Sequence, residues 1–270
     1  DKEELGERKA QAYTARAMGY EAPLLQALQA QFDYQRDAVL DALARTPQER
    51  SMRAKDYVAD LAQWDQYDEA MKAILAPYLY QVIVDVGAEA MAEIGYQPSQ
   101  YDPYTPNIMR YQDERATKIA VDVNDETEKQ LRASITEGIK AGESTYEIRA
   151  RVEQVFGFAV TERADRIART EVARAQSFAD VEAWGQSGVV EAKEWYTAKD
   201  ERVCKFCGPM HGRVIDLQEN FFDKGDVQTE SGKNRKGEKA TFTMNHDYDD
   251  VSGAPLHPNC RCVLLPVRTR

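Results

Sequence analysis

All four cysteines of this 270-residue chain lie in two short motifs that could hold a metal ion. The first motif is Cys204-x-x-Cys207, and the second is the run His257-Pro-Asn-Cys260-Arg-Cys262. A C-x-x-C turn points two thiolates at one ion, and a histidine and a cysteine from elsewhere in the chain can complete a tetrahedral zinc site. The two motifs together therefore predict one zinc site.

Five candidate ligands are available for the four positions of a tetrahedral site. We expect Cys204, Cys207, His257 and Cys260 to bind the ion, with Cys262 as the alternative fourth ligand. Cys260 and Cys262 are two residues apart, so on a strand both side chains would face the same side. An ion with four protein ligands is structural, because catalytic zinc normally keeps an open position for water.

Two other states of the cysteines are compatible with the sequence: two disulfide bonds, or four buried free thiols. The N-terminal residues contain neither the basic region nor the apolar region of a signal peptide, so we expect a reducing compartment that disfavours disulfides. The remaining histidines, His211 and His246, are expected to be ordinary surface or loop residues.

A second group of chemical interest is Arg169-Thr170-Glu171, with Arg174 near the edge of the same expected helix. Glu171 falls in the middle of the apolar helix face, where a carboxylate must be paired. We interpret the group as a structural polar network that joins helix to sheet. The alternative is a metal-containing enzyme or toxin-like module that uses Glu171 and Arg169. No histidine or nucleophile is close in sequence, and no HExxH, GxSxG or GxGxxG pattern occurs, so we expect no enzyme.

A third segment, residues 231–239, contains four basic residues: Lys233, Arg235, Lys236 and Lys239. Its glycine spacing is that of a P-loop, but the phosphate-binding lysine is missing and no strand precedes it. We expect a solvated basic loop, with contact to nucleic acid as the alternative. The net charge of −11 argues against a free, sequence-specific DNA binder, because phosphate contacts require basic residues, and it fits protein partners.

The first hundred residues are expected to be helical. Apolar residues recur at helical spacing from Pro23, taken as the first turn of a helix, to Leu43, and again over residues 52–94, where Pro77 kinks or divides the pattern. Three prolines between residues 95 and 108 then break both helix and strand. No run approaches the ~18 apolar residues of a membrane-spanning helix, so no membrane association is expected.

Three further helices are expected before the sequence pattern changes from helical spacing to that of short strands. The first begins at Asn124 or Asp125 and stops at Gly142. A capping box formed by Ser144 and Glu147 begins the second. The third has Thr161 as its cap and ends at Gly185 or Gly188.

Short strands are expected after these helices, near residues 189–198, 204–217 and 260–267. The fold class is therefore α+β: long N-terminal helices, followed by a helical and small antiparallel β module stabilised by a Cys/His zinc-type site. The expected division of the chain is an N-terminal helical region (1–96), a Pro/Tyr-rich linker (97–109) and a C-terminal domain (110–270) with a polar insertion (223–254).

Three stretches, taken in order, resemble the phage head morphogenesis family, the minor head proteins similar to the F protein of phage Mu. They are RADRIARTEVARAQSFADVEAW, EWYTAKDERVCKFCGPMHGRVI and HPNCRCVLLPV. The family's C-x-x-C falls on Cys204 and Cys207, and its H-P-x-C-R-C falls on His257, Cys260 and Cys262. Its R-T-E falls on residues 169–171. The long polar segment 223–254 departs from the family pattern.

The resemblance implies a minor structural protein of a tailed-phage head. Its partners would be the portal protein and the major capsid or scaffolding protein, with contact to packaged DNA as a further possibility. Its roles would be procapsid assembly, head morphogenesis and DNA packaging or ejection. It would be located in the virion, at the portal vertex of the head, and in the host cytoplasm during assembly.

Overall fold

The computed structural model describes residues 2–45, 63–197, 203–233 and 236–268. The chain forms two compact units that are interleaved along the sequence. The first unit comprises residues 1–20, 81–108 and 169–270, and the second comprises residues 21–80 and 109–168. The expected division of the chain into three consecutive regions, 1–96, 97–109 and 110–270, remains a prediction.

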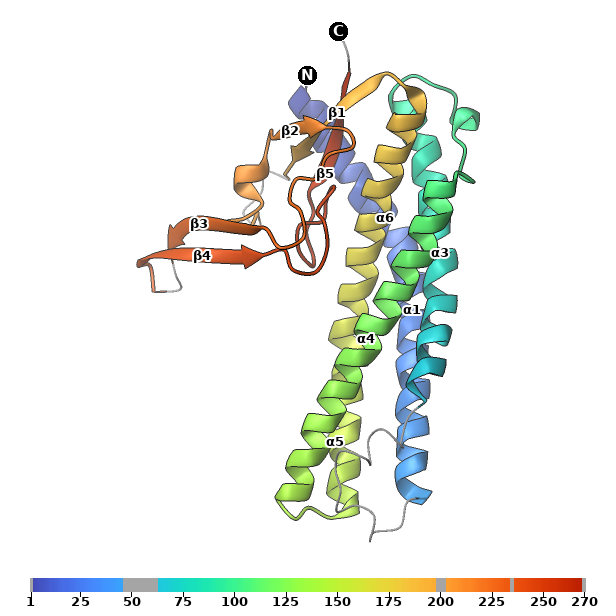
Figure 1. The fold of residues 1–270 in the computed structure, drawn as a ribbon, viewed down its shortest axis with the longest axis vertical. Coiled ribbons are helices and arrows are strands. Elements are labelled where there is room, and N and C mark those ends of the chain that lie inside the picture. Colours follow the sequence, from blue (N-terminus) through green and yellow to red (C-terminus); the bar gives the residue numbers. More distant parts are fainter. Residues whose placement is uncertain (1, 46–62, 198–202, 234–235, 269–270) are drawn as a thin grey trace. The chain divides into compact units, whose positions relative to one another are not determined.

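Long helices dominate the described residues, as expected from the apolar spacing (Figure 1). They are α1 (Lys2–Arg45), α3 (Trp64–Glu93), α4 (Pro106–Lys140), α5 (Thr145–Phe158) and α6 (Ala164–Ser187). None of these described helices is both long and apolar enough to cross a bilayer. The first part of the expected helical stretch 52–94, residues 52–62, lies outside the described residues.

Two of the expected helix starts are wrong. Pro23 lies inside α1, and Asn124 and Asp125 lie inside α4. Pro77 lies inside α3, which continues past it. A proline in a helix removes one backbone hydrogen bond, and the packing of a long helix face outweighs that local loss. The Asn124 side chain is used in tertiary packing instead of a cap, because its amide donates to Asp68 Oδ1 at 2.7 Å.

The helix ends around α5 follow the expected capping chemistry except at Thr161. Ser144 and Glu147 form the capping box, with the Ser144 N–H donating to Glu147 Oε2 at 2.7 Å. Gly142 and Gly188 have φ values of 73° and 69°, which suits glycine after a helix. Thr161 is no cap: it lies in the π-helical turn η3 (Ala159–Arg163), which continues α5 into α6, and its hydroxyl donates to the Gly157 carbonyl at 2.9 Å.

A three-stranded antiparallel sheet belongs to the first unit. Its order is β2 (Val214–Asp216), β1 (Val190–Tyr196) and β5 (Val263–Arg268), which confirms the three expected strands. In register, Tyr196 of β1 faces Val263 of β5. Tyr196, Val263 and Leu265 form a buried cluster with Tyr13 of α1. A Cβ on Gly6 of α1 would lie 2.3 Å from the Tyr196 ring, so only glycine allows this close approach.

The polar insertion is not a plain loop. Most of it forms a separate two-stranded hairpin of β3 (Val227–Lys233) and β4 (Lys239–Asn245), which corrects the expectation (Figure 1). Seven residue pairs join the strands, from Val227↔Asn245 to Lys233↔Lys239. Threonines at alternate positions and the single Phe242 give these residues the period of a strand, and β-branched and aromatic residues favour strands.

Candidate metal centre

The C-x-x-C motif forms a tight turn between β1 and β2. The Cys207 N–H donates to Cys204 Sγ at 3.3 Å, and the Gly208 N–H donates to the Cys204 carbonyl at 3.0 Å. The short helix η4 (Gly208–Met210) follows directly. This turn brings both sulfur atoms to one side of the backbone, which is the arrangement of a zinc knuckle.

A second turn, formed by His257 to Cys260, leads into β5. The Cys260 N–H donates to the His257 carbonyl at 3.1 Å, and Asn259 has φ 62°, a left-handed conformation that asparagine tolerates better than most residues. His257 Nδ1 lies 2.8 Å from the Pro258 carbonyl, so an Nδ1–H can donate to it while Nε2 faces the sulfur atoms. The expectation that Cys260 and Cys262 share a strand face is wrong, because β5 begins only at Val263.

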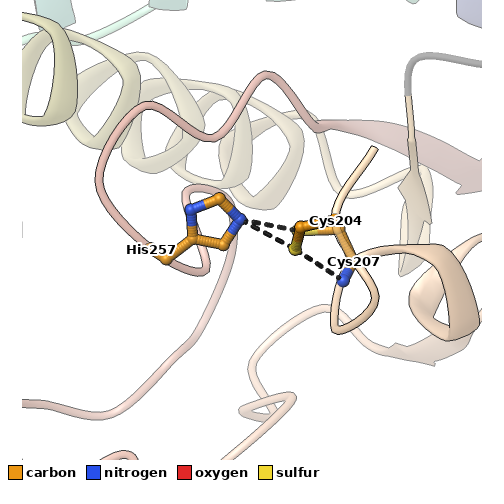
Figure 2. Close-up of side chains that lie close together, drawn as sticks. All are labelled: Cys204, Cys207 and His257. Carbon is orange, nitrogen blue, oxygen red and sulfur yellow. Dashed lines mark hydrogen bonds between the residues drawn. The ribbon is translucent and has the colours of Figure 1, made fainter. Parts of the chain in front are cut away.

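The two turns bring the candidate ligands together, as Figure 2 shows for three of them. His257 Nε2 lies 3.1 Å from Cys204 Sγ and 3.2 Å from Cys207 Sγ. Cys207 Sγ lies 3.7 Å from Cys260 Sγ. The potential ligand atoms form two triads, Cys204–Cys207–His257 and Cys207–Cys260–Cys262, each with all atoms within 4.8 Å of one another. Cys207 is common to both triads.

All four cysteines are free thiols, so the disulfide alternative does not apply to this structure. A sulfur–sulfur separation of 3.7 Å between Cys207 and Cys260 far exceeds the ~2.05 Å of a disulfide bond. The fourth ligand stays open between Cys260 and Cys262, since both belong to the second triad.

Hydrogen bonding within the cluster favours thiolates at Cys204 and Cys260. The hydrogen bond with Cys207, and after it His257, lowers the pKa of the Cys204 thiol to about 4. The hydrogen bond between His257 and Cys204 raises the pKa of His257 to about 9. Hydrogen bonding to Cys207 also holds the pKa of Cys260 well below its ordinary value. The hydrogen bond with Cys204 raises the pKa of the Cys207 thiol, and the pKa of Cys262 is raised as well. Adjacent thiolates with an imidazole are the donor set that zinc prefers, so these residues fit a zinc ion.

The Glu171 group lies on α6 and has the geometry of an ion pair. Glu171 is 6% exposed, and its Oε2 lies 3.8 Å from Arg174 Nε. Thr170 is buried, whereas Arg169 is exposed. In the described parts of the chain, the two ligand triads contain no carboxylate, so Glu171 is not brought into the metal centre.

The other two histidines differ from each other. His211 Nδ1 accepts from the Thr197 N–H at 3.2 Å, and its Nε2 lies 3.8 Å from Glu3, so it is a polar residue outside the triads. His246 is completely buried and stacks on Phe222 with ring centroids 4.3 Å apart. His246 lies in the loop directly after β4, one of the two expected settings, but it is buried rather than at the surface and serves as a packing residue.

A buried charge cluster in the first unit was missed by sequence reasoning. Lys9 Nζ of α1 lies 2.7 Å from Glu93 Oε2 of α3 and 3.2 Å from Asp180 Oδ1 of α6. Tyr13 donates to Asp180 Oδ2 at 2.8 Å. Burial raises the pKa of Asp180 to about 6, with Lys9 opposing this shift. The position of Asp180 between Ala179 and Ala183 on an apolar face is the pattern that singled out Glu171, and it could have identified this cluster.

The basic segment lies at the end of the β3–β4 hairpin. Lys233 ends β3, Lys239 begins β4, and Lys236 lies in the turn between them. All three are exposed. Arg235, the fourth candidate for nucleic-acid contact, lies outside the described residues.

The comparisons with known proteins agree with the resemblance noted in the sequence. A family model described as Phage Mu protein F like protein matches residues 129–265, half of the chain. The match contains α5, α6, the first two strands of the sheet, both turns of the metal centre and the hairpin. No curated protein and no solved structure matches the chain. The chain belongs to the family of Phage Mu protein F like proteins.

Proposed function

We propose that this chain is a minor head protein that assembles at the portal vertex of a tailed phage, with one structural zinc ion in its C-terminal module. Membership of the family suggests a phage head protein. Its proposed partners are the portal protein and the major capsid or scaffolding protein, and its proposed roles are procapsid assembly, head morphogenesis and DNA packaging or ejection.

The observation that carries the proposal is the position of the Cys/His cluster inside the matched segment. All five candidate ligands fall within residues 129–265. They join the turn after β1 to the turn before β5, which are far apart in the sequence. An ion held there would close a large loop and stabilise the module that carries the three-stranded sheet.

We propose a structural rather than a catalytic ion because protein side chains alone can fill the tetrahedron. Cys204, Cys207 and His257 supply three positions, and Cys260 or Cys262 supplies the fourth. Catalytic zinc sites normally combine three protein ligands with a water molecule. The proposal therefore includes no enzymatic activity, and Glu171 with Arg174 keeps its proposed role in a structural polar network.

Incorporation into heads tests the functional part. Procapsids would be assembled with the tagged chain, and the purified particles and a portal pull-down would be probed for it. We expect the chain to co-purify with the portal protein and with procapsids. A chain that folds but joins neither would contradict the head-protein proposal.

Elemental analysis of the purified chain tests the metal part. We expect about one zinc per chain for a mononuclear tetrahedral site, and its loss in Cys204→Ser together with a lower melting temperature. His211→Asn is the matched control, because His211 lies outside both triads, and it should keep the metal. A metal-free wild type that melts at the same temperature as Cys204→Ser would contradict a structural site.

A further inference from the structure

One face of the β3–β4 hairpin carries hydroxyl and ammonium groups and no carboxylate. Cross-strand pairing places Thr229 opposite Thr243, Ser231 opposite Thr241, and Lys233 opposite Lys239. Side chains alternate between the two faces of a strand, so these six residues share one face, which continues to the pair Val227 and Asn245 at its other end. All six are exposed. We call them the hydroxyl–lysine face.

The opposite face of the hairpin is the one attached to the protein. Gln228 is buried, and its Nε2 donates to the Phe206 carbonyl of the C-x-x-C turn at 2.9 Å. Lys205 of the same turn lies over the Phe242 ring. Glu230, the acidic residue of β3, pairs with Phe242 on this attached face. The hydroxyl–lysine face is therefore presented by a hairpin anchored through its other side.

The lysine pair at the end of this face lacks an internal counterion. Like charges directly opposite each other across two strands destabilise a hairpin. Among the residues that the structure describes, the side chains of Lys233 and Lys239 form no ion pair or hydrogen bond; their backbones pair in the ladder. Glu238 lies next to Lys239 at the turn and has an interaction of its own. An external anion would remove the repulsion between the two ammonium groups.

We infer that the hydroxyl–lysine face binds the phosphate backbone of double-stranded DNA. Lysine, serine and threonine side chains are the common donors to phosphate oxygens, and such contacts need no base-specific residues. The three cross-strand pairs are spaced about 6.8 Å apart along the strands, so the face can follow successive backbone groups. The choice of double-stranded DNA as the occupant rests on the proposed head-protein function, whereas the preference for phosphates rests on the face itself.

The test measures binding of the purified full chain to a short fluorescent DNA duplex over a range of salt concentrations. Lys233→Gln/Lys239→Gln removes two phosphate contacts, so the slope of log K against log salt should become shallower by roughly 1.8. Affinity at 0.1 M salt should fall by about tenfold for each lysine. Lys129→Gln/Lys140→Gln on α4 is the charge-matched control and should bind like the wild type.

A second variant distinguishes hydroxyl contacts from charge. Thr229→Val/Thr243→Val keeps the shape and the strand preference of both side chains, so it should weaken binding without changing the salt slope. Circular dichroism would verify that each variant is folded.

Three outcomes would overturn the inference. They are no duplex binding by the wild type at low salt, equal salt slopes for the hairpin variant and its control, or binding of heparin without binding of the duplex. The assay contains no other head component, so its failure leaves the head-protein proposal standing. Failure of procapsid incorporation, in turn, leaves a measured DNA affinity intact.

Discussion

Gln228 of β3 donates a 2.9 Å hydrogen bond to the carbonyl of Phe206, which lies between the two cysteines of the C-x-x-C turn. The hairpin and the candidate metal centre are thus joined through this buried amide and through Lys205, which lies over the Phe242 ring. A tight turn keeps its carbonyl in place only while its conformation is held, and a bound ion would hold it. Metal binding and the order of the hairpin should therefore be coupled.

Removal of the metal should loosen the hairpin before the helices. Chelation, or Cys204→Ser, should increase amide hydrogen exchange over residues 227–233 and 239–245, because the Phe206 carbonyl no longer offers a fixed acceptor. Gln228→Ala should raise exchange in the same strands by a free-energy change of about 1 kcal/mol while keeping the metal. Exchange that is unchanged in the hairpin after chelation would show that the two parts are independent.

Asp180 should make stability depend on pH between about 4 and 6. Its pKa in the folded chain, about 6, is raised by burial above the ordinary value of an aspartate, so the folded state binds the proton more tightly. Asp180 therefore favours folding most at low pH, and this contribution is lost as the pH rises through about 6. The difference in unfolding free energy between the wild type and Asp180→Asn should shift by roughly 2–3 kcal/mol over this range.

The measurement for Asp180 is urea denaturation of both proteins at a series of pH values. Lys9→Met is the informative companion, because it removes the cation that faces both Asp180 and Glu93, and it should destabilise the chain at neutral pH. A constant difference between the wild type and Asp180→Asn from pH 4 to 7 would contradict the raised pKa.

Two glycines of α1 should respond in opposite directions to alanine. Gly6→Ala places a methyl group against the Tyr196 ring and should lower stability by about 1–3 kcal/mol. Gly19→Ala, in the same helix with nothing within 4 Å of the added carbon, should raise stability by about 0.5–1 kcal/mol. Thermal unfolding of the two single variants checks this, and equal melting temperatures would exclude the packing of α1 on the sheet at Gly6.

Glu171 should act through stability and not through turnover. Glu171→Gln keeps the shape of the side chain and removes the charge that faces Arg174, so a loss of about 1 kcal/mol is expected. The double variant with Arg174→Gln should be less destabilised than the sum of the two single changes. Strict additivity of the three unfolding free energies would show that the two side chains are not coupled.

Local chemistry in the sequence determined much of this protein. The capping box at Ser144, the glycine stops at Gly142 and Gly188, the three strands and each of the two ligand motifs follow from residue types at short spacing. Each depends on a hydrogen bond, a backbone conformation or a donor set that a few neighbouring residues define. Family membership followed from the order of the same motifs.

Only the tertiary structure decided the features that depend on contacts between distant residues. Pro23, Pro77 and Asn124 lie inside helices because the packing of long helix faces outweighs a local preference. The sequence did not predict the partners of two features. The buried cluster around Asp180 combines side chains from three helices. The hairpin depends on the register between its two strands, which decides which side chains share a face. The difference lies in range: a cap is completed within a few residues, whereas a buried charge or a strand pair is completed by a partner elsewhere in the chain.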